Sequence, residues 1–144
     1  MVDTFRTNDT HDALVTLVAT ISVLQGCRKG VPESLGTTVS AFVATGGFIP
    51  NDRMTSLAED NIRFLVTFGF KVAGAEANAE AKLNTCIDEF RRIWRNDRRS
   101  ANLGGTVAGW SIESLADAPE YRPFAGIEYR LYPVLVTAKQ RETF

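Results

Sequence analysis

One stretch, residues 61–72 (NIRFLVTFGFKV), constrains the fold more than any other part of this chain. Six apolar side chains recur there at every second position, and only Leu65 is out of character on the opposite, mainly polar face. A period of two is typical of a β-strand with one buried face. The sequence therefore predicts a central strand whose core face carries Ile62, Phe64, Val66, Phe68, Phe70 and Val72.

Two other segments carry apolar residues at helical spacing. The first helix is expected over residues 10–25, where Gly26 is placed to end it. The second is expected from Glu76 to Asn96, with an alanine-rich start that favours helix formation. Its apolar stripe consists of Ala79, Leu83, Cys86, Ile87, Phe90, Ile93 and Trp94.

Three further segments, residues 37–50, 104–115 and 125–139, have the composition of strands. The polar residues 51–60 are interpreted as a mobile connection, and 116–124 as a loop with two prolines. The order helix, strand, strand, helix, strand, strand predicts a single α+β domain over residues 1–144. Such a domain has a mostly antiparallel sheet of about four strands, with both helices packed on one face.

The last predicted strand contains Pro133, and proline is tolerated in a strand mainly at a sheet edge or a bulge. The strand is therefore expected to lie at an edge or to bend at this residue. Tyr132, Val134 and Val136 would then form its outer face. Because an exposed edge invites pairing, we expect another chain to cover these three residues.

Positive charge gathers at the end of the second helix, although the chain as a whole is close to neutral. The net charge is -1, from 16 basic and 17 acidic residues, which is not typical of a dedicated nucleic-acid binder. The arginines can complement the helix dipole, contact a polyanion or pair with acidic groups of another subunit. They are Arg91, Arg92, Arg95, Arg98 and Arg99.

No catalytic, cofactor-binding or metal-binding residue is predicted. His11, the single histidine, is expected at the surface, and Glu76 and Glu80 are interpreted as solvated helix surface. Cys27 and Cys86 lie far apart with no histidine near either, which argues against zinc. With no basic and apolar leader pattern and no apolar run long enough for a bilayer, we expect a protein of the reducing cytoplasm.

The chain resembles a known family over most of its length, with the nearest match to a motif at residues 102–107 and in the last strand. A long second helix, an arginine-rich exit, the turn NLGGTV at residues 102–107, and the last strand GIEYRLYPVLVTAK at 126–139 are similar to tail terminator proteins of long-tailed bacteriophages. These are also called tail completion proteins. The order of the elements and the length agree with that family.

The resemblance implies a virion structural protein and not an enzyme. Family members are made in the host cytoplasm and form a ring, expected to be a hexamer, on the tail tube protein at the end of the tail. The ring stops tube polymerisation and offers a docking surface for the head-side connector, or stopper, protein. DNA passes through the ring without specific binding, and no cofactor or membrane is involved.

In this setting the five arginines become candidates for contacts between subunits, together with Tyr132, Val134 and Val136. Two alternatives stay open. One is a neighbouring neck or tube-layer protein of the same virion. The other is a small cytosolic α+β enzyme or ligand-binding domain, which would require a deep cavity lined by Phe64, Phe68, Phe70 and Trp110.

Overall fold

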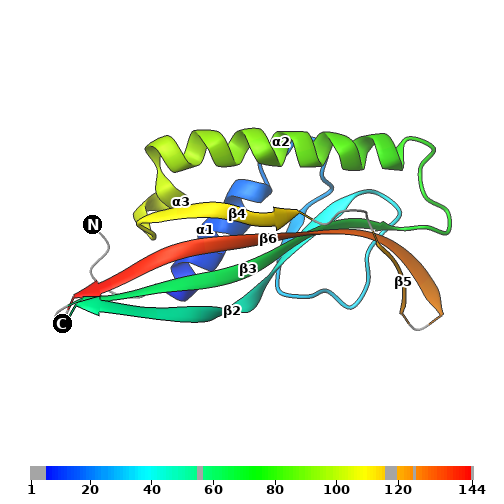
Figure 1. Ribbon diagram of the computed structural model, residues 1–144. Coiled ribbons are helices and arrows are strands. Elements are labelled where there is room, and N and C mark those ends of the chain that lie inside the picture. Colours follow the sequence, from blue (N-terminus) through cyan, green and yellow to red (C-terminus); the bar gives the residue numbers. More distant parts are fainter. Residues whose placement is uncertain (1–5, 55–56, 116–119, 125, 144) are drawn as a thin grey trace.

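The computed structural model describes residues 6–54, 57–115, 120–124 and 126–143 (Figure 1). It is an α+β fold, as the sequence predicts. In chain order its elements are α1 (Thr7–Val18), β1 (Cys27–Lys29), β2 (Ser40–Met54), β3 (Leu57–Lys71), α2 (Ala79–Ser100), α3 (Asn102–Gly105), β4 (Gly109–Leu115), β5 (Glu120–Phe124) and β6 (Ile127–Thr143).

The six strands of the described residues form one mixed, mostly antiparallel sheet in the order β1-β2-β3-β6-β4, and β5 pairs with β6. Only the β1–β2 pair is parallel among them. The two strands missing from the sequence-based prediction are β1, with three residues, and β5, with five residues including a proline. Both are too short to show a clear period of two.

The alternating stretch of β3 forms the centre of the core, as predicted. Phe64, Val66 and Phe68 are fully buried. The ring of Phe68 lies 5.6 Å from that of Phe90 on α2, and the ring of Phe64 lies 5.2 Å from that of His11 on α1. Since Phe64 and Phe68 share one face of β3, both helices cover the same face of the sheet. The opposite face, which we call the open face, carries no helix in the described part of the chain.

The last strand does not lie at an edge, and Tyr132, Val134 and Val136 face the opposite way from the prediction. β6 is not an edge strand, because it lies between β3 on one side and β4 and β5 on the other. Pro133 is tolerated there because it falls between the stretch of β6 that pairs with β5, ending at Leu131, and the stretch that pairs with β4, starting at Val134. In the described chain Pro133 therefore does not interrupt the pairing of β6 with either β4 or β5.

The hairpin between β2 and β3 is longer than the sequence suggests. Residues 51–60 were expected to form a mobile connection, yet β2 continues to Met54 and β3 begins at Leu57. These largely polar ends pair with each other, and β3 also pairs with the end of β6, so ladder hydrogen bonds keep the segment in the sheet. Figure 1 shows β2, β3 and β6 extending together beyond the helices.

The helix boundaries also shift. α1 ends at Val18 and not near residue 25, because the chain continues in tight turns in which the N–H groups of Thr20 and Ile21 donate to the carbonyls of Leu17 and Val18. Ile21 is still buried in the core by these turns. Of the helices in the described ranges, none combines the length and apolar character needed to cross a bilayer.

Candidate subunit interface

The α2 helix presents its arginines to solvent, and all five are exposed. Its buried positions are Ala79, Leu83, Cys86 and Phe90. Successive spacings of three and four residues place Arg92, Arg95 and Arg99 in one line on the opposite side of the helix. We call these three residues, with Arg91 and Arg98 beside them, the arginine ridge.

The arginine ridge has few partners within the described residues. Arg91 lies 3.8 Å from Asp88, and the guanidinium of Arg98 lies 4.6 Å from the centre of the Trp94 ring. No acidic group of the described chain forms an ion pair with Arg92, Arg95 or Arg99. Interaction with the helix dipole contributes about 0.3–1 kcal/mol per charge near the C-terminus. The ridge therefore leaves positive charge available to an external partner.

The end of α2 that carries the ridge is anchored to the sheet. One carboxylate oxygen of Asp97, Oδ2, accepts hydrogen bonds from the backbone N–H of Leu103 and from the indole Nε1 of Trp110, each at 2.8 Å. The indole Nε1 of Trp94 donates in turn to the carbonyl oxygen of Trp110 at 3.1 Å. These bonds hold the ridge at a fixed height above β4.

The NLGG segment forms α3, a single turn in the left-handed region. Its φ angles are 46° at Asn102, 52° at Leu103, 68° at Gly104 and 77° at Gly105. A left-handed conformation costs roughly 1–2 kcal/mol at a residue other than glycine. Leu103 offsets this cost by its burial, with 2% of its surface exposed, and by its bond to Asp97.

Tyr132, Val134 and Val136 do not form an outer surface. They pair with Phe68, Val66 and Phe64 across the antiparallel ladder, and cross-strand partners share a face of the sheet. Val134 and Val136 are buried, and Tyr132 packs against the same core. Because these side chains lie beneath the helices, the prediction that another chain covers them is wrong.

The alternate residues of β6 face the other way and line a hollow on the open face. This hollow, which we call the trough, has a volume of about 500 Å³. The segment 31–36 forms one wall, and strands β2, β3 and β6 form the floor. Its lining residues are Val31, Pro32, Glu33, Ser34, Leu35, Phe42, Leu65, Thr67, Tyr129, Leu131 and Pro133.

Gly69 allows the wall of the trough to approach the sheet. A Cβ atom at this position would lie 2.6 Å from the carbonyl oxygen of Arg130, 2.8 Å from Cδ2 of Leu131 and 3.2 Å from Cδ1 of Leu35. The backbone N–H of Lys71 also donates to the carbonyl oxygen of Gly36 at 2.7 Å. The segment 31–36 is thus fixed against the sheet at its far end.

The trough differs from the cavity that the sequence suggested for a ligand-binding domain. Phe64, Phe68, Phe70 and Trp110 lie in the buried core under the helices, and none of them lines the trough. Sequence reasoning missed the trough, although Leu65 gave a signal. This apolar residue, out of place on a polar face, lies in the floor of the trough.

Other residues singled out in the sequence have structural partners. His11 is buried and not at the surface, and its Nε2 lies 2.7 Å from the carbonyl oxygen of Val43, so that this nitrogen carries the hydrogen. Glu76 pairs with Lys82. The hydrogen bond from Lys82 is the largest of the effects that lower the pKa of the Glu76 carboxyl group. Glu80 receives two hydrogen bonds from Arg130. The two glutamates therefore do not form a joint site.

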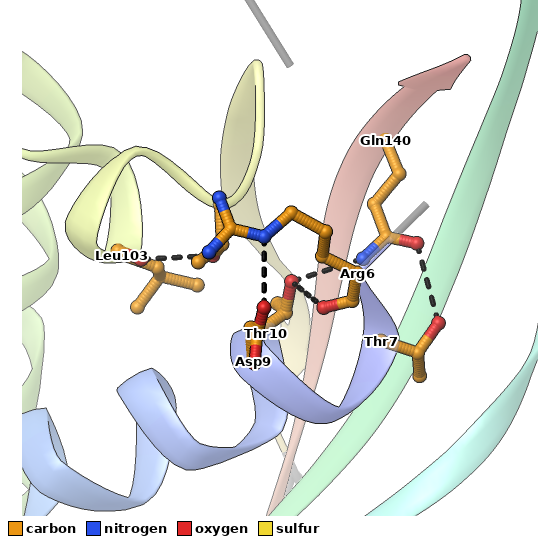
Figure 2. A network of polar contacts seen from close by, with 7 residues as sticks. Arg6, Thr7, Asp9, Thr10, Leu103 and Gln140 are labelled. Carbon is orange, nitrogen blue, oxygen red and sulfur yellow. Dashed lines mark hydrogen bonds and ion pairs between the residues drawn. The ribbon is translucent and has the colours of Figure 1, made fainter. Parts of the chain in front are cut away.

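A polar network ties the start of α1 to the end of β6 (Figure 2). The amide of Gln140, fully buried, donates to the hydroxyl of Thr10 at 2.9 Å, and that hydroxyl donates to the carbonyl oxygen of Arg6. Arg6 also pairs with Asp9 at 2.8 Å. Since these groups satisfy one another, the network holds the fold together. Within the described ranges no cluster of three or more metal-ligating side chains is found.

Comparison with protein-family models and with curated proteins finds no match for this chain.

Proposed function

We propose that this chain is a tail terminator of a long-tailed bacteriophage, a structural subunit that acts by assembly. The observation that carries the proposal is a pair of unlike surfaces without partners. The arginine ridge lies on the outer side of α2 and faces away from the sheet. The apolar trough opens on the other side of the sheet, which carries no helix in the described chain. Unlike surfaces on one molecule favour head-to-tail contacts, which form a ring when the rotation between subunits closes.

In this proposal the ring is a hexamer that sits on the last layer of tail tube protein in the virion. It stops tube polymerisation and provides the docking surface for the head-side connector. The genome passes through the central opening without sequence-specific contact. The resemblance of residues 102–107 and of the last strand to the family supports this assignment.

The arginine ridge is proposed to make contacts between subunits. Arginine suits this role because its planar guanidinium pairs with a carboxylate through two parallel hydrogen bonds. The bonds from Asp97 to Leu103 and Trp110 hold the ridge in place, so its charges can meet a partner in a fixed geometry. Loss of one such desolvated pair costs about 2–5 kcal/mol of association.

The experiment compares wild type with Arg95→Glu and Arg98→Glu in two assays. Ring formation is followed by sedimentation velocity, and capping is followed by the length of tail tubes grown from purified tube protein. We expect both variants to remain folded, with a small loss of stability from the helix dipole, and to lose ring formation or capping. Asn84→Glu, at an exposed residue of α2 outside the arginine ridge, is the matched control and should behave as wild type.

Three outcomes would count against the proposal. If both variants cap tubes at the wild-type concentration, the ridge is solvated surface. If wild type never limits tube length but is incorporated along the tube, the chain belongs to the tube layer. If it binds only the isolated connector, a neighbouring neck protein is the better assignment.

A ligand-binding domain is the second candidate, because the trough volume of about 500 Å³ falls within the range of small-molecule sites. This candidate predicts a monomer at all concentrations that retains a small molecule in native mass spectrometry. A discrete ring without bound small molecule would exclude it.

A further inference from the structure

One large apolar side chain outside the trough is left in solvent. Phe48 on β2 has 62% of its surface exposed. Among the described residues the other large hydrophobic side chain exposed to this extent is Val31, which itself lines the trough. The described part of the molecule thus carries a protruding aromatic ring and, at a different place, an apolar hollow.

Phe48 cannot fill the trough of its own chain. It pairs with Ile62, a residue of the helix-covered face of β3, whereas the trough floor contains Leu65 and Thr67 on the open face. Cross-strand partners share a face, so Phe48 and the trough lie on opposite faces of one continuous sheet. Only another molecule can bring the two surfaces together.

Along the strand direction, Phe48 lies at the same position in the sheet as Trp110, to which the ridge-bearing end of α2 is bonded. The residues Phe48, Ile62, Ala138 and Trp110 occupy successive positions across β2, β3, β6 and β4. Three strand spacings of about 4.8 Å place Phe48 roughly 15 Å from Trp110, over which the end of α2 is anchored. One side of the molecule therefore presents an exposed aromatic ring together with positive charge.

The trough presents the complementary properties. Its floor and walls are mainly apolar, and its one charged lining residue is Glu33, an exposed acid for which the described residues supply no ion pair. An apolar hollow with the carboxylate of Glu33 at its wall matches an aromatic ring flanked by positive charge.

We propose that Phe48 of one copy of this chain enters the trough of the next copy. This inference rests on the proposed function and names the contact through which its subunits would join. The contact is head-to-tail, because the two surfaces are different and lie on opposite faces. One aromatic side chain buries about 150–250 Å², whereas a stable interface buries about 800 Å² per partner. Phe48 is therefore the anchor of a larger interface that also brings the arginine ridge toward acidic groups.

The test uses two variants of the whole chain, each changing an exposed side chain. Phe48→Ser removes the aromatic ring and leaves the trough intact, and Val31→Glu places a charge at the trough and leaves Phe48 intact. Both should keep the wild-type melting temperature. Each variant alone should self-associate at least about thirtyfold more weakly than wild type in sedimentation velocity, the loss expected for an anchor residue.

The mixture of the two variants distinguishes this contact from any other. The Val31→Glu copy still offers Phe48 and the Phe48→Ser copy still offers a trough, so one intact contact can form between them. We expect the equimolar mixture to give a 1:1 dimer that does not grow further, while each variant alone stays monomeric. A symmetric contact between two Phe48 residues would survive in Val31→Glu alone, and one between two troughs would survive in Phe48→Ser alone.

The outcomes separate this inference from the proposed function. If wild type forms rings and Phe48→Ser forms them equally well, or if mixing yields no dimer, the Phe48 contact is wrong and the ring remains. If wild type stays monomeric at every concentration and does not cap tail tubes, both fail. If the 1:1 dimer forms but tubes are never capped, the contact is supported and the terminator assignment is overturned.

Discussion

The Oδ2 oxygen of Asp97 lies 2.8 Å from the indole Nε1 of Trp110, so a carboxylate near the end of α2 is hydrogen-bonded directly to the second residue of β4. The same oxygen accepts the backbone N–H of Leu103. A single acidic side chain thus fixes the left-handed turn and the arginine-bearing end of the helix at once.

Replacing Asp97 with alanine should destabilise the fold. Two part-buried donors would lose their shared acceptor, and each such donor costs about 1–3 kcal/mol when left without a partner. The free energy of unfolding is measured by urea denaturation. The control is Asp88→Ala on the same helix, where an exposed carboxylate 3.8 Å from Arg91 contributes little. Equal losses in the two variants would mean that the Asp97 bonds do not stabilise the junction.

Phe68→Ala should be among the most damaging single substitutions. The side chain is fully buried and packs against Phe90, and removal of a buried phenylalanine costs about 3–5 kcal/mol. Phe48→Ala provides the comparison, because the side chain is 62% exposed and surface changes usually stay within about 0.5 kcal/mol. Urea melts of both variants check the difference. A loss under 1 kcal/mol for Phe68→Ala would contradict the facing of β3.

Gly69→Ala should destabilise the protein by about 1–3 kcal/mol through overpacking. The new methyl group would meet a backbone carbonyl at 2.6 Å in the β3–β6 ladder, where the backbone has little room to move. Gly109→Ala in β4 is the matched control, since no atom lies within 4 Å of its Cβ position. Thermal denaturation of the pair should show a lower melting temperature for Gly69→Ala alone.

Gly105→Ala tests the left-handed turn separately from packing. Nothing lies within 4 Å of the added Cβ, so the expected loss of about 1–2 kcal/mol comes from the φ angle of 77°. Gly26→Ala also meets no atom within 4 Å and has no positive φ, so it should be nearly neutral. If the two variants unfold at the same urea concentration, the turn is not left-handed at this residue.

The buried thiol of Cys86 gives the protein a pH dependence in the alkaline range. Burial raises the pKa of Cys86 to about 12, from 9.0 for an unperturbed thiol. The folded state therefore holds this proton more tightly than the unfolded state. The resulting stability is complete below pH 9 and is lost as the pH rises through 12, by about 1.4 kcal/mol for each unit of pKa difference.

The measurement is the urea midpoint of wild type and of Cys86→Ala between pH 8 and pH 11, a range chosen around the unfolded pKa of about 8.5–9. Comparing slopes with pH removes the constant cost of the substitution itself. Wild type should lose stability more steeply than the variant as the pH rises. Parallel slopes would show that the thiol titrates alike in the folded and unfolded chains.

The parts of the fold that a local pattern determines could be predicted from the sequence. The period of two over residues 61–72 identified the central strand and its buried face, and the stripe from Ala79 to Phe90 identified α2. These patterns arise because each element buries one of its faces, and the spacing of apolar residues in the sequence shows that face directly.

The parts that depend on which strands pair could not be predicted. Pro133 suggested an edge strand, and only the register shows that it falls between the partners β5 and β4. This reversed the facing assigned to Tyr132, Val134 and Val136. The trough escaped prediction for the same reason, because its residues come from segments that are distant in sequence and are joined only by the sheet.

The position of β6 in the sheet has a consequence for synthesis of the protein. β3, β4 and β5 all pair with β6, which is the last of the described strands in chain order. Until the ribosome has released those residues, the edge of β3 lacks its partner, and β4 and β5 have no strand of the described chain to join. The sheet therefore cannot be completed before residues 127–143 have left the ribosome, and a nascent chain stalled before residue 127 exposes an unpaired edge that invites aggregation.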